Sequence, residues 1–96
     1  MIVALLPVTS SFAANKDVAQ TIRLEQILPA LSKNKIIILD FAGVDGTTQS
    51  FIHALISDPI REYGPLFFDL VSFRHCNEVV MKIITIVTDY MQESLS

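Results

Sequence analysis

The sequence is short of cysteine, glycine and charge. Its 96 residues include one cysteine, no tryptophan and three glycines, and 18% of them are charged. A single cysteine allows no disulfide within the chain and is typical of a reducing compartment, so we expect a cytoplasmic protein. Ten acidic residues against seven basic ones leave a formal net charge of −3. A chain with this charge offers no basic surface for nucleic acid or for an anionic membrane.

Long hydrophobic runs are also missing. A transmembrane helix needs about 18 or more consecutive apolar residues, and the longest apolar stretch, Met1 to Val8, is interrupted by Pro7. The segment ending in Phe12-Ala13-Ala14 imitates a secretory signal, but no Lys or Arg precedes its apolar part. We therefore predict neither a membrane span nor a signal peptide.

Hydrophobic residues make up 51% of the chain, and this content over 96 residues predicts one folded domain, residues 1–96. Three apolar runs of strand length are separated by longer stretches with helical spacing: Ile2 to Leu6, Ile36 to Phe41 and Leu66 to Phe73. The third run is apolar on both faces, as parallel strands covered on both sides are. The order βαβαβα with helical crossovers predicts a layered α/β domain with parallel strands and helices packed on the sheet.

The first helix is expected between the first two strands. Asn15 or Asp17 can cap its start, and Pro29 is expected to loosen its last turn. The residues with helical spacing on its inner face are Val18, Ala19, Ile22, Ile27 and Leu31.

The second helix is expected after the second strand. Thr47 or Thr48 can serve as its N-cap, and its apolar stripe continues to about Tyr63. Pro59 interrupts this stripe, so we expect a kink or a short break there.

The last helix is predicted from near Asn77, a good cap, to about Glu93. Its apolar residues form a wide stripe: Val79, Val80, Ile83, Ile84, Ile86, Val87, Tyr90 and Met91. A stripe of this width either faces a sheet and a neighbouring helix or also meets another subunit, as in a homodimer.

The most polar segment runs from Asp40 to Ser50, between the second strand and the second helix. In open parallel sheets, binding groups gather where strands end and helices begin. The free N–H groups of a helix start favour a carboxylate or a phosphate, and Thr47, Thr48 and Ser50 place three hydroxyls there. From these residues alone two interpretations stay open: the segment is only a cap and a turn, or it binds an anion or a partner.

The residues around this segment do not complete a catalytic or a metal site. Ser50, His53 and Asp40 supply the residue types of a hydrolase, but the strained Gly-x-Ser-x-Gly turn that exposes a catalytic serine is missing. A Mg²⁺ site would favour a third acidic residue close in sequence to Asp40 and Asp45, and the chain has none there. We expect neither an enzymatic activity nor a cofactor.

The run Ile38 to Leu55, ILDFAGVDGTTQSFIHAL, resembles the signature of the bacterial STAS-like domains of unknown function, relatives of the anti-sigma-factor antagonists. In this signature an apolar strand ends in Asp-Phe, a Gly-Val turn follows, and Thr-Gln-Ser-Phe opens a helix. Val71 to Val80 resembles the family's last strand and its final helix start, and the likeness covers about Ser10 to Tyr90. It implies a STAS fold: a sheet of about four strands, mostly parallel apart from an edge strand, with helices on it and no bound cofactor.

The resemblance also implies a regulatory signalling domain that docks to a protein partner, an ATP-binding kinase-like or anti-sigma-like protein. In the antagonists, a serine at this helix start is phosphorylated, and the phosphate prevents docking. Aligning the strands places Gln49 against that serine and Ser50 one position later, which makes Ser50 the first phosphorylation candidate and Thr48 the second. The expected partner-binding residues are Asp45, Thr47, Thr48, Gln49, Ser50, His53 and Ser57. The alternative is a small-ligand or anion-binding domain that uses the same helix N-terminus.

Overall fold

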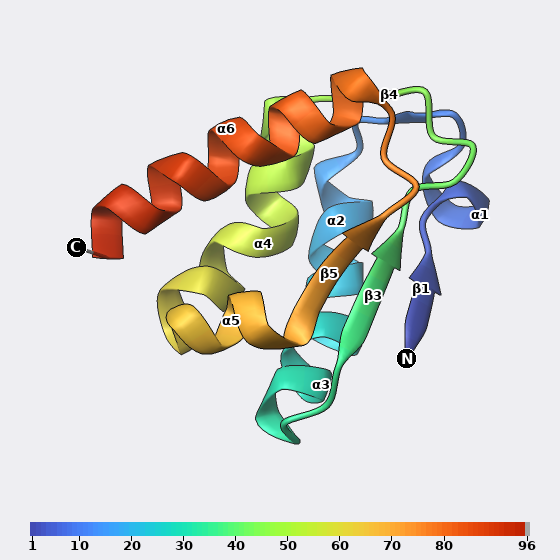
Figure 1. Ribbon diagram of the computed structural model, residues 1–96. Helices are drawn as coiled ribbons and strands as arrows, with labels where there is room; N and C mark the ends of the chain where they lie inside the picture. The colour runs from blue at the N-terminus through green and yellow to red at the C-terminus, as the bar shows by residue number, and fades with distance from the viewer. Residues whose placement is uncertain (96) are drawn as a thin grey trace.

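The computed structural model describes residues 1–95, so Ser96 of the predicted domain lies outside the described residues. The fold is mixed α/β, with a sheet of β1 (Ile2–Ala4), β3 (Ile37–Asp40) and β5 (Val71–Arg74) in the order β1-β3-β5 (Figure 1). All its pairings are parallel, as the helical crossovers require. The predicted βαβαβα order and parallel sheet are confirmed.

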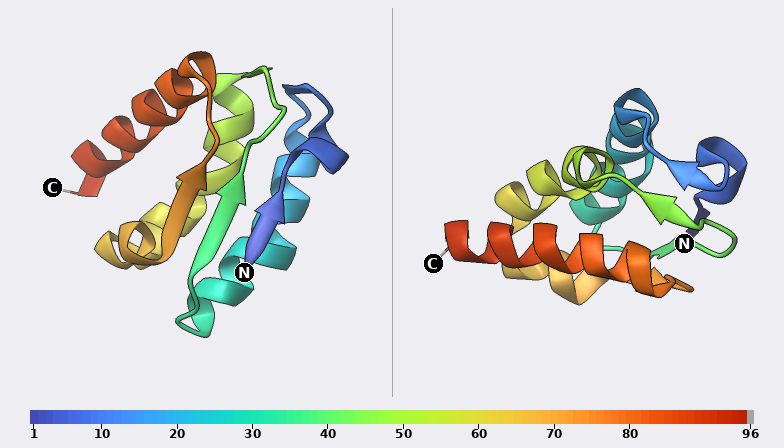
Figure 2. Two further views of the ribbon diagram at one scale, coloured as in Figure 1. Left: turned by 45° about the vertical axis from the view of Figure 1, so that its right-hand side comes forward. Right: turned by 90° about the horizontal axis from the view of Figure 1, so that it is seen from above.

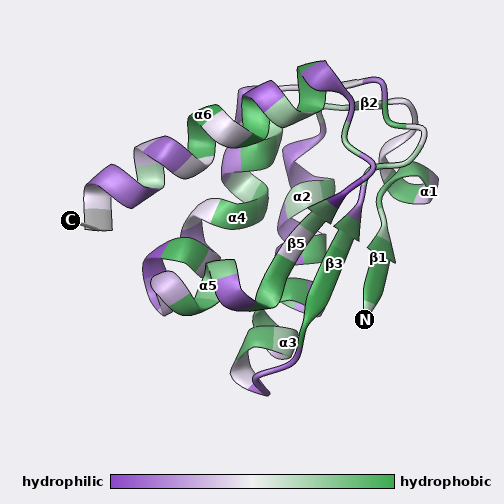
Figure 3. Cartoon of the chain, viewed as in Figure 1, coloured by the Kyte–Doolittle hydropathy of each residue, from purple (hydrophilic) through white to green (hydrophobic). Residues whose placement is uncertain are grey.

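Helices cover one face of this sheet. The strand order rises steadily, so each crossover moves the chain in the same direction, and α2 and α4 lie on the same side (Figures 1 and 2). Ile37 and Leu39 point to that side and are fully buried, whereas Ile38 is half-buried and its paired neighbours Ile2 and Ser72 are exposed. The expectation that the strands are covered on both faces is wrong, although Figure 3 shows the three strands as largely hydrophobic.

The first helical stretch combines α2 (Lys16–Ile22), the π turn η1 (Arg23–Ile27) and α3 (Leu28–Ser32). Asn15 is the cap, since its Oδ1 accepts a hydrogen bond of 2.9 Å from the Asp17 backbone N–H. The predicted inner face is buried except for the half-buried Val18: Ala19, Ile22, Ile27 and Leu31. The helix changes from the α form to the wider π form just before Pro29, because Pro29 has no N–H to donate to the α-helical pattern.

The second predicted helix is α4 (Gln49–Tyr63), and the last is α6 (Glu78–Leu95). The break expected in α4 is absent, since the helix continues through Pro59. Proline removes one helical hydrogen bond, but Pro59 and the neighbouring Ile60 are both buried, and burial of their apolar surface offsets part of the loss. Within residues 1–95, no helix combines the length and the apolar character needed to cross a membrane.

The third predicted strand is only half correct. Its first part forms a short helix, α5 (Pro65–Leu70), and the strand begins at Val71. Pro65 occupies the first helical position, which its fixed φ favours. The buried residues Phe67 and Leu70 are three positions apart, a helical spacing that a continuous apolar run conceals.

The N-terminal run contains elements that the sequence did not reveal. After β1 the chain forms α1 (Leu6–Thr9) instead of extending the strand to Leu6, and then β2 (Phe12–Ala13) pairs in parallel with β4 (Gly46–Thr47). The resemblance implied about four strands with an antiparallel edge. The part of the chain described by the structure has instead three parallel strands and this separate parallel pair.

Candidate functional site

The loop that follows β3 is held in place by the segment around β2. The Asp45 N–H donates to the Ser11 carbonyl at 2.7 Å, and the Thr48 N–H donates to the Ala13 carbonyl at 3.1 Å. The Thr47 hydroxyl donates to the same Ala13 carbonyl at 2.8 Å. These hydrogen bonds fix the approach of the chain to α4, so the start of this helix is positioned before any ligand arrives.

The start of α6 supports the same loop from the other side. The Asn77 side-chain amide donates to the Asp45 carbonyl at 2.7 Å, while its Oδ1 caps α6 by accepting from the Val80 N–H at 2.8 Å. Gly43 provides the bend, since its φ of +82° is strained for other residues and a Cβ there would lie 2.7 Å from a Leu6 methyl.

The first turn of α4 separates core residues from exposed polar ones. Thr48 is the cap, because its Oγ1 accepts a hydrogen bond of 3.0 Å from the Phe51 N–H. Phe51 and Ile52 are fully buried. The exposed side chains of this turn and the next are Gln49, Ser50 and His53.

Two of the predicted partner-binding residues are not accessible. Thr47 is 6% exposed and Ser57 is 4% exposed, so neither can take part in a surface contact. Thr47 is enclosed because β4 pairs with β2. Ser57 is enclosed because α4 contacts α2, α5 and α6, which buries a wider part of the helix than its apolar stripe indicated. The accessible members of the predicted partner-binding set, called the α4 strip below, are Asp45, Thr48, Gln49, Ser50 and His53, with Thr48 half-buried.

A shallow hollow of about 460 Å³ lies beside Ser50 and His53. Its other lining residues are Gln49 and Ala54 of α4 and Lys16, the first residue of α2. No local pattern in the sequence marks Lys16 as a neighbour of this helix start. The available signal was topological: helices that leave parallel strands in the same direction begin at the same edge of the sheet, so the first turn of α2 had to lie near that of α4.

A second polar pair lies at the ends of β3 and β5. Asp40 Oδ1 is 2.9 Å from Nδ1 of His75 and accepts a hydrogen bond of 3.0 Å from the Ala42 N–H. The hydrogen bond with His75 and then that with Ala42 lower the pKa of Asp40 below its ordinary value. Asp40 therefore links the ends of two neighbouring strands by its contact with His75. The hydrolase hypothesis instead grouped this carboxylate with His53.

This pair predicts an acid-sensitive contribution to stability. Because the pKa of Asp40 is lower in the folded protein than in the unfolded chain, the contribution is fully present above about pH 4 and is lost as the pH falls through the folded-state pKa. We expect urea unfolding between about pH 5 and pH 2 to show a steeper loss of stability for the wild type than for Asp40→Asn. Equal slopes for the two proteins would show that the pair contributes nothing.

The other candidate chemical groups stay apart in the described residues. No hydrogen bond joins Ser50 to His53 in residues 1–95, and this part of the chain has no group of three side chains suited to hold a metal ion. Cys76 is half-buried, and its desolvation and then the nearby Asp40 charge raise the pKa of its thiol. The reactive thiolate form is therefore disfavoured.

The comparison with protein families bears on this arrangement. A family model described as a STAS-like domain of unknown function matches residues 18–81. The chain belongs to this family. The matched part of the STAS-like domain runs from α2 to the first turn of α6 and contains the predicted partner-binding residues and the Asp40–His75 pair. Neither the curated proteins nor the solved structures gave a significant match.

Proposed function

We propose that this STAS-like domain is a non-enzymatic regulatory module of the cytoplasm that binds a partner protein through the α4 strip. The observation that carries the proposal is the exposed polar strip at the start of α4, held on a buried base. Gln49, Ser50 and His53 face solvent directly above Phe51 and Ile52, which are fully buried. A rigid, open strip of this kind suits contact with another protein surface better than it suits enclosure of a substrate.

The two phosphorylation candidates differ in their surroundings. The Thr48 hydroxyl is half-buried and already caps α4, so a phosphate there would disturb the cap. Ser50 is exposed, and within residues 1–95 no hydrogen bond engages its hydroxyl. We therefore assign any regulatory phosphate to Ser50.

A phosphate on Ser50 would change the surface without unfolding it. It adds a charge of about −1.5 to −2, which the start of a helix tolerates, and Lys16 lines the same hollow. An acidic partner surface would be repelled by the same charge. The proposed partner is an ATP-binding kinase-like or anti-sigma-like protein.

The test replaces Ser50 with aspartate. We expect Ser50→Asp to reduce capture of the native partner by about tenfold or more. Repulsion between the added negative charge and an acidic partner surface costs at least about 1.4 kcal/mol. Quantitative mass spectrometry of proteins captured from a lysate identifies the partner, and a binding titration with the purified partner measures the loss. His53→Glu should act in the same direction.

The matched control is Ser32→Asp, which adds the same charge at the exposed end of α3, at the opposite end of the fold (Figure 1). It should leave capture unchanged. Thermal unfolding of all three variants should agree with the wild type to within about 0.5 kcal/mol, as surface substitutions do. If Ser50→Asp and His53→Glu are folded and retain every native interaction, the docking proposal is wrong.

The second candidate function is binding of a small anion at the same helix start, which the hollow beside Lys16 and His53 favours. Calorimetry with inorganic phosphate and with nucleotides separates the two candidates. Binding heat that is lost in Lys16→Glu would support the anion site. Wild-type protein that gives no heat with any of these ligands would exclude it.

A further inference from the structure

The imidazole of His75 is held at the carboxyl end of the sheet. His75 directly follows β5 and has a φ of +58°, a left-handed conformation that turns the chain before α6. The ends of β3 and β5 lie side by side (Figure 1), with Asp40 paired in register with Arg74. The turn leaves Nδ1 of His75 2.9 Å from Oδ1 of Asp40. The ring is therefore fixed through one nitrogen, while 60% of the side chain stays exposed.

This hydrogen bond determines which ring nitrogen carries the proton. The contact with His75 and then the hydrogen bond from the Ala42 N–H lower the pKa of Asp40, so its carboxyl group is ionised near neutral pH. An ionised carboxylate can only accept a hydrogen bond, so the shared proton lies on Nδ1 of His75. In the neutral ring the free lone pair is then on Nε2. Within residues 1–95 no hydrogen bond engages Nε2, which makes it a nucleophile open to solvent.

A free cation lies beside this pair. The register places Arg74 next to Asp40 on the face of the sheet opposite to α2 and α4, and the Arg74 charge also lowers the pKa of Asp40. Arg74 is exposed, and no ion pair within the described residues engages its guanidinium. On the other side Asp40 is paired with Ala4, which is exposed and small. The site is therefore open, and its guanidinium matches the oxygens of a phosphoryl group.

We propose that Nε2 of His75 is a phosphoryl-acceptor site for a donor with a reactive phosphorus–nitrogen bond, such as the phosphohistidine of another protein. The lone pair of Nε2 attacks phosphorus, a new P–N bond forms, and the P–N bond of the donor breaks. The donor nitrogen leaves as a neutral base with the electron pair of the broken bond. The Nδ1 proton stays in place, and the Asp40 carboxylate stabilises the positive charge that develops on the ring. Arg74 binds the phosphoryl oxygens.

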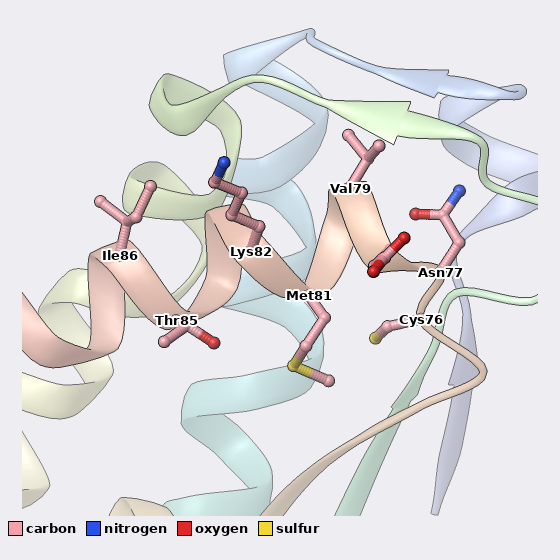
Figure 4. Close-up of a pocket in the computed structure, with 8 residues that line it drawn as sticks. Cys76, Asn77, Val79, Met81, Lys82, Thr85 and Ile86 are labelled. Carbon is pink, nitrogen blue, oxygen red and sulfur yellow. The ribbon is translucent and has the colours of Figure 1, made fainter.

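Two other uses of an Asp–His pair fit this site less well. A general base needs a hydroxyl or thiol beside Nε2, and none makes a hydrogen bond with His75 in residues 1–95. The neighbouring thiol of Cys76 lines the depression along α6 (Figure 4) and lies 3.9 Å from the Arg74 carbonyl. A metal ion needs further ligands, and the described residues hold no group of three suited side chains. Phosphoryl transfer needs only one attacking nitrogen.

The chain contains its own comparison, since it has two histidines. His53 is also exposed, but within residues 1–95 no carboxylate holds its ring. The experiment incubates the folded full chain with phosphoramidate at neutral pH. Phosphorus NMR follows the label on each histidine, and mass spectrometry after digestion assigns it. We expect His75 to be phosphorylated about tenfold faster than His53, and on Nε2 alone.

Asp40→Asn tests the role of the carboxylate. Asparagine can still accept from the Ala42 N–H, but its amide can also donate to Nδ1 and so does not fix the proton there. The rate at His75 should fall to within about threefold of the rate at His53, and phosphorylation of Nδ1 should appear as well. A role of Asp40 in stability alone would not change which ring nitrogen is labelled.

Two further variants test the cation and the general effect of charge. Arg74→Gln leaves the Asp40–His75 contact intact and should slow labelling of His75 by about threefold or more. Asp69→Asn is the matched control, because it removes a carboxylate at an exposed position of α5, before the other end of β5. It should leave the rate within about twofold of the wild type. Circular dichroism checks that each variant is folded.

Two outcomes would overturn the proposal. One is a wild-type protein in which His75 is labelled no faster than His53. The other is a rate at His75 that neither Asp40→Asn nor Arg74→Gln changes. Neither outcome bears on the α4 strip, because partner capture is tested by substitutions at Ser50 and His53.

Discussion

Replacing Phe51 with alanine is expected to lower the free energy of unfolding by about 3–5 kcal/mol. Phe51 is fully buried and is one of the largest side chains of the core. Its backbone N–H also donates the hydrogen bond that the Thr48 side chain accepts at the start of α4. A small domain has about 5–15 kcal/mol of stability in total, so urea unfolding should show a midpoint far below that of the wild type.

Two variants define the origin of this loss. Phe51→Leu keeps most of the apolar volume and should cost less than half as much as Phe51→Ala. Ser50→Ala changes the exposed neighbour and should alter stability by less than about 0.5 kcal/mol. A loss below about 1 kcal/mol for Phe51→Ala would contradict the packing described here. It would also remove the buried support on which the proposed docking role of the exposed α4 residues depends.

Replacing Asn77 with alanine is expected to cost about 2 kcal/mol. One part of the loss is the cap of α6, because Oδ1 accepts from the Val80 N–H at 2.8 Å. The other part is the link to the loop before α4, because Nδ2 donates to the Asp45 carbonyl at 2.7 Å. Each interaction contributes about 1 kcal/mol, and urea unfolding measures their sum.

Asn77→Asp separates the two contributions. Aspartate caps helices about as well as asparagine, but it cannot donate to the Asp45 carbonyl. We expect this variant to lose about 1 kcal/mol or slightly more, and amide exchange at Asp45 and Gly46 should become faster. If Asn77→Asp is as stable as the wild type and its loop exchanges at the same rate, the link does not hold the loop.

The helix starts could be predicted because their signals are local. Asn15, Thr48 and Asn77 each precede a run with helical spacing, and each is a cap in the structure. The run after Gly64 could not be assigned locally. Its apolar residues satisfy both a buried strand and a short buried helix, and the choice depends on Pro65 and on the packing of Phe67 in the core.

The site was predicted less completely than the fold. The exposed residues Gln49, Ser50 and His53 follow from the helical stripe of α4. The burial of Ser57 does not, because it depends on the number of helices packed around α4. The pairing of Asp40 with His75 joins residues 35 positions apart, and no periodicity reports such a contact.

The steadily rising strand order also has a consequence for how the chain folds. Ile2 pairs with Ile38, which in turn pairs with Ser72, so the three-stranded sheet has no hairpin that could nucleate it. Each pairing must close a long loop first, and its entropic cost is recovered only after the intervening helix has formed. The helices are therefore expected to form before the sheet. During synthesis β1 leaves the ribosome well before β3, so its apolar residues stay unpaired until β3 has been synthesised.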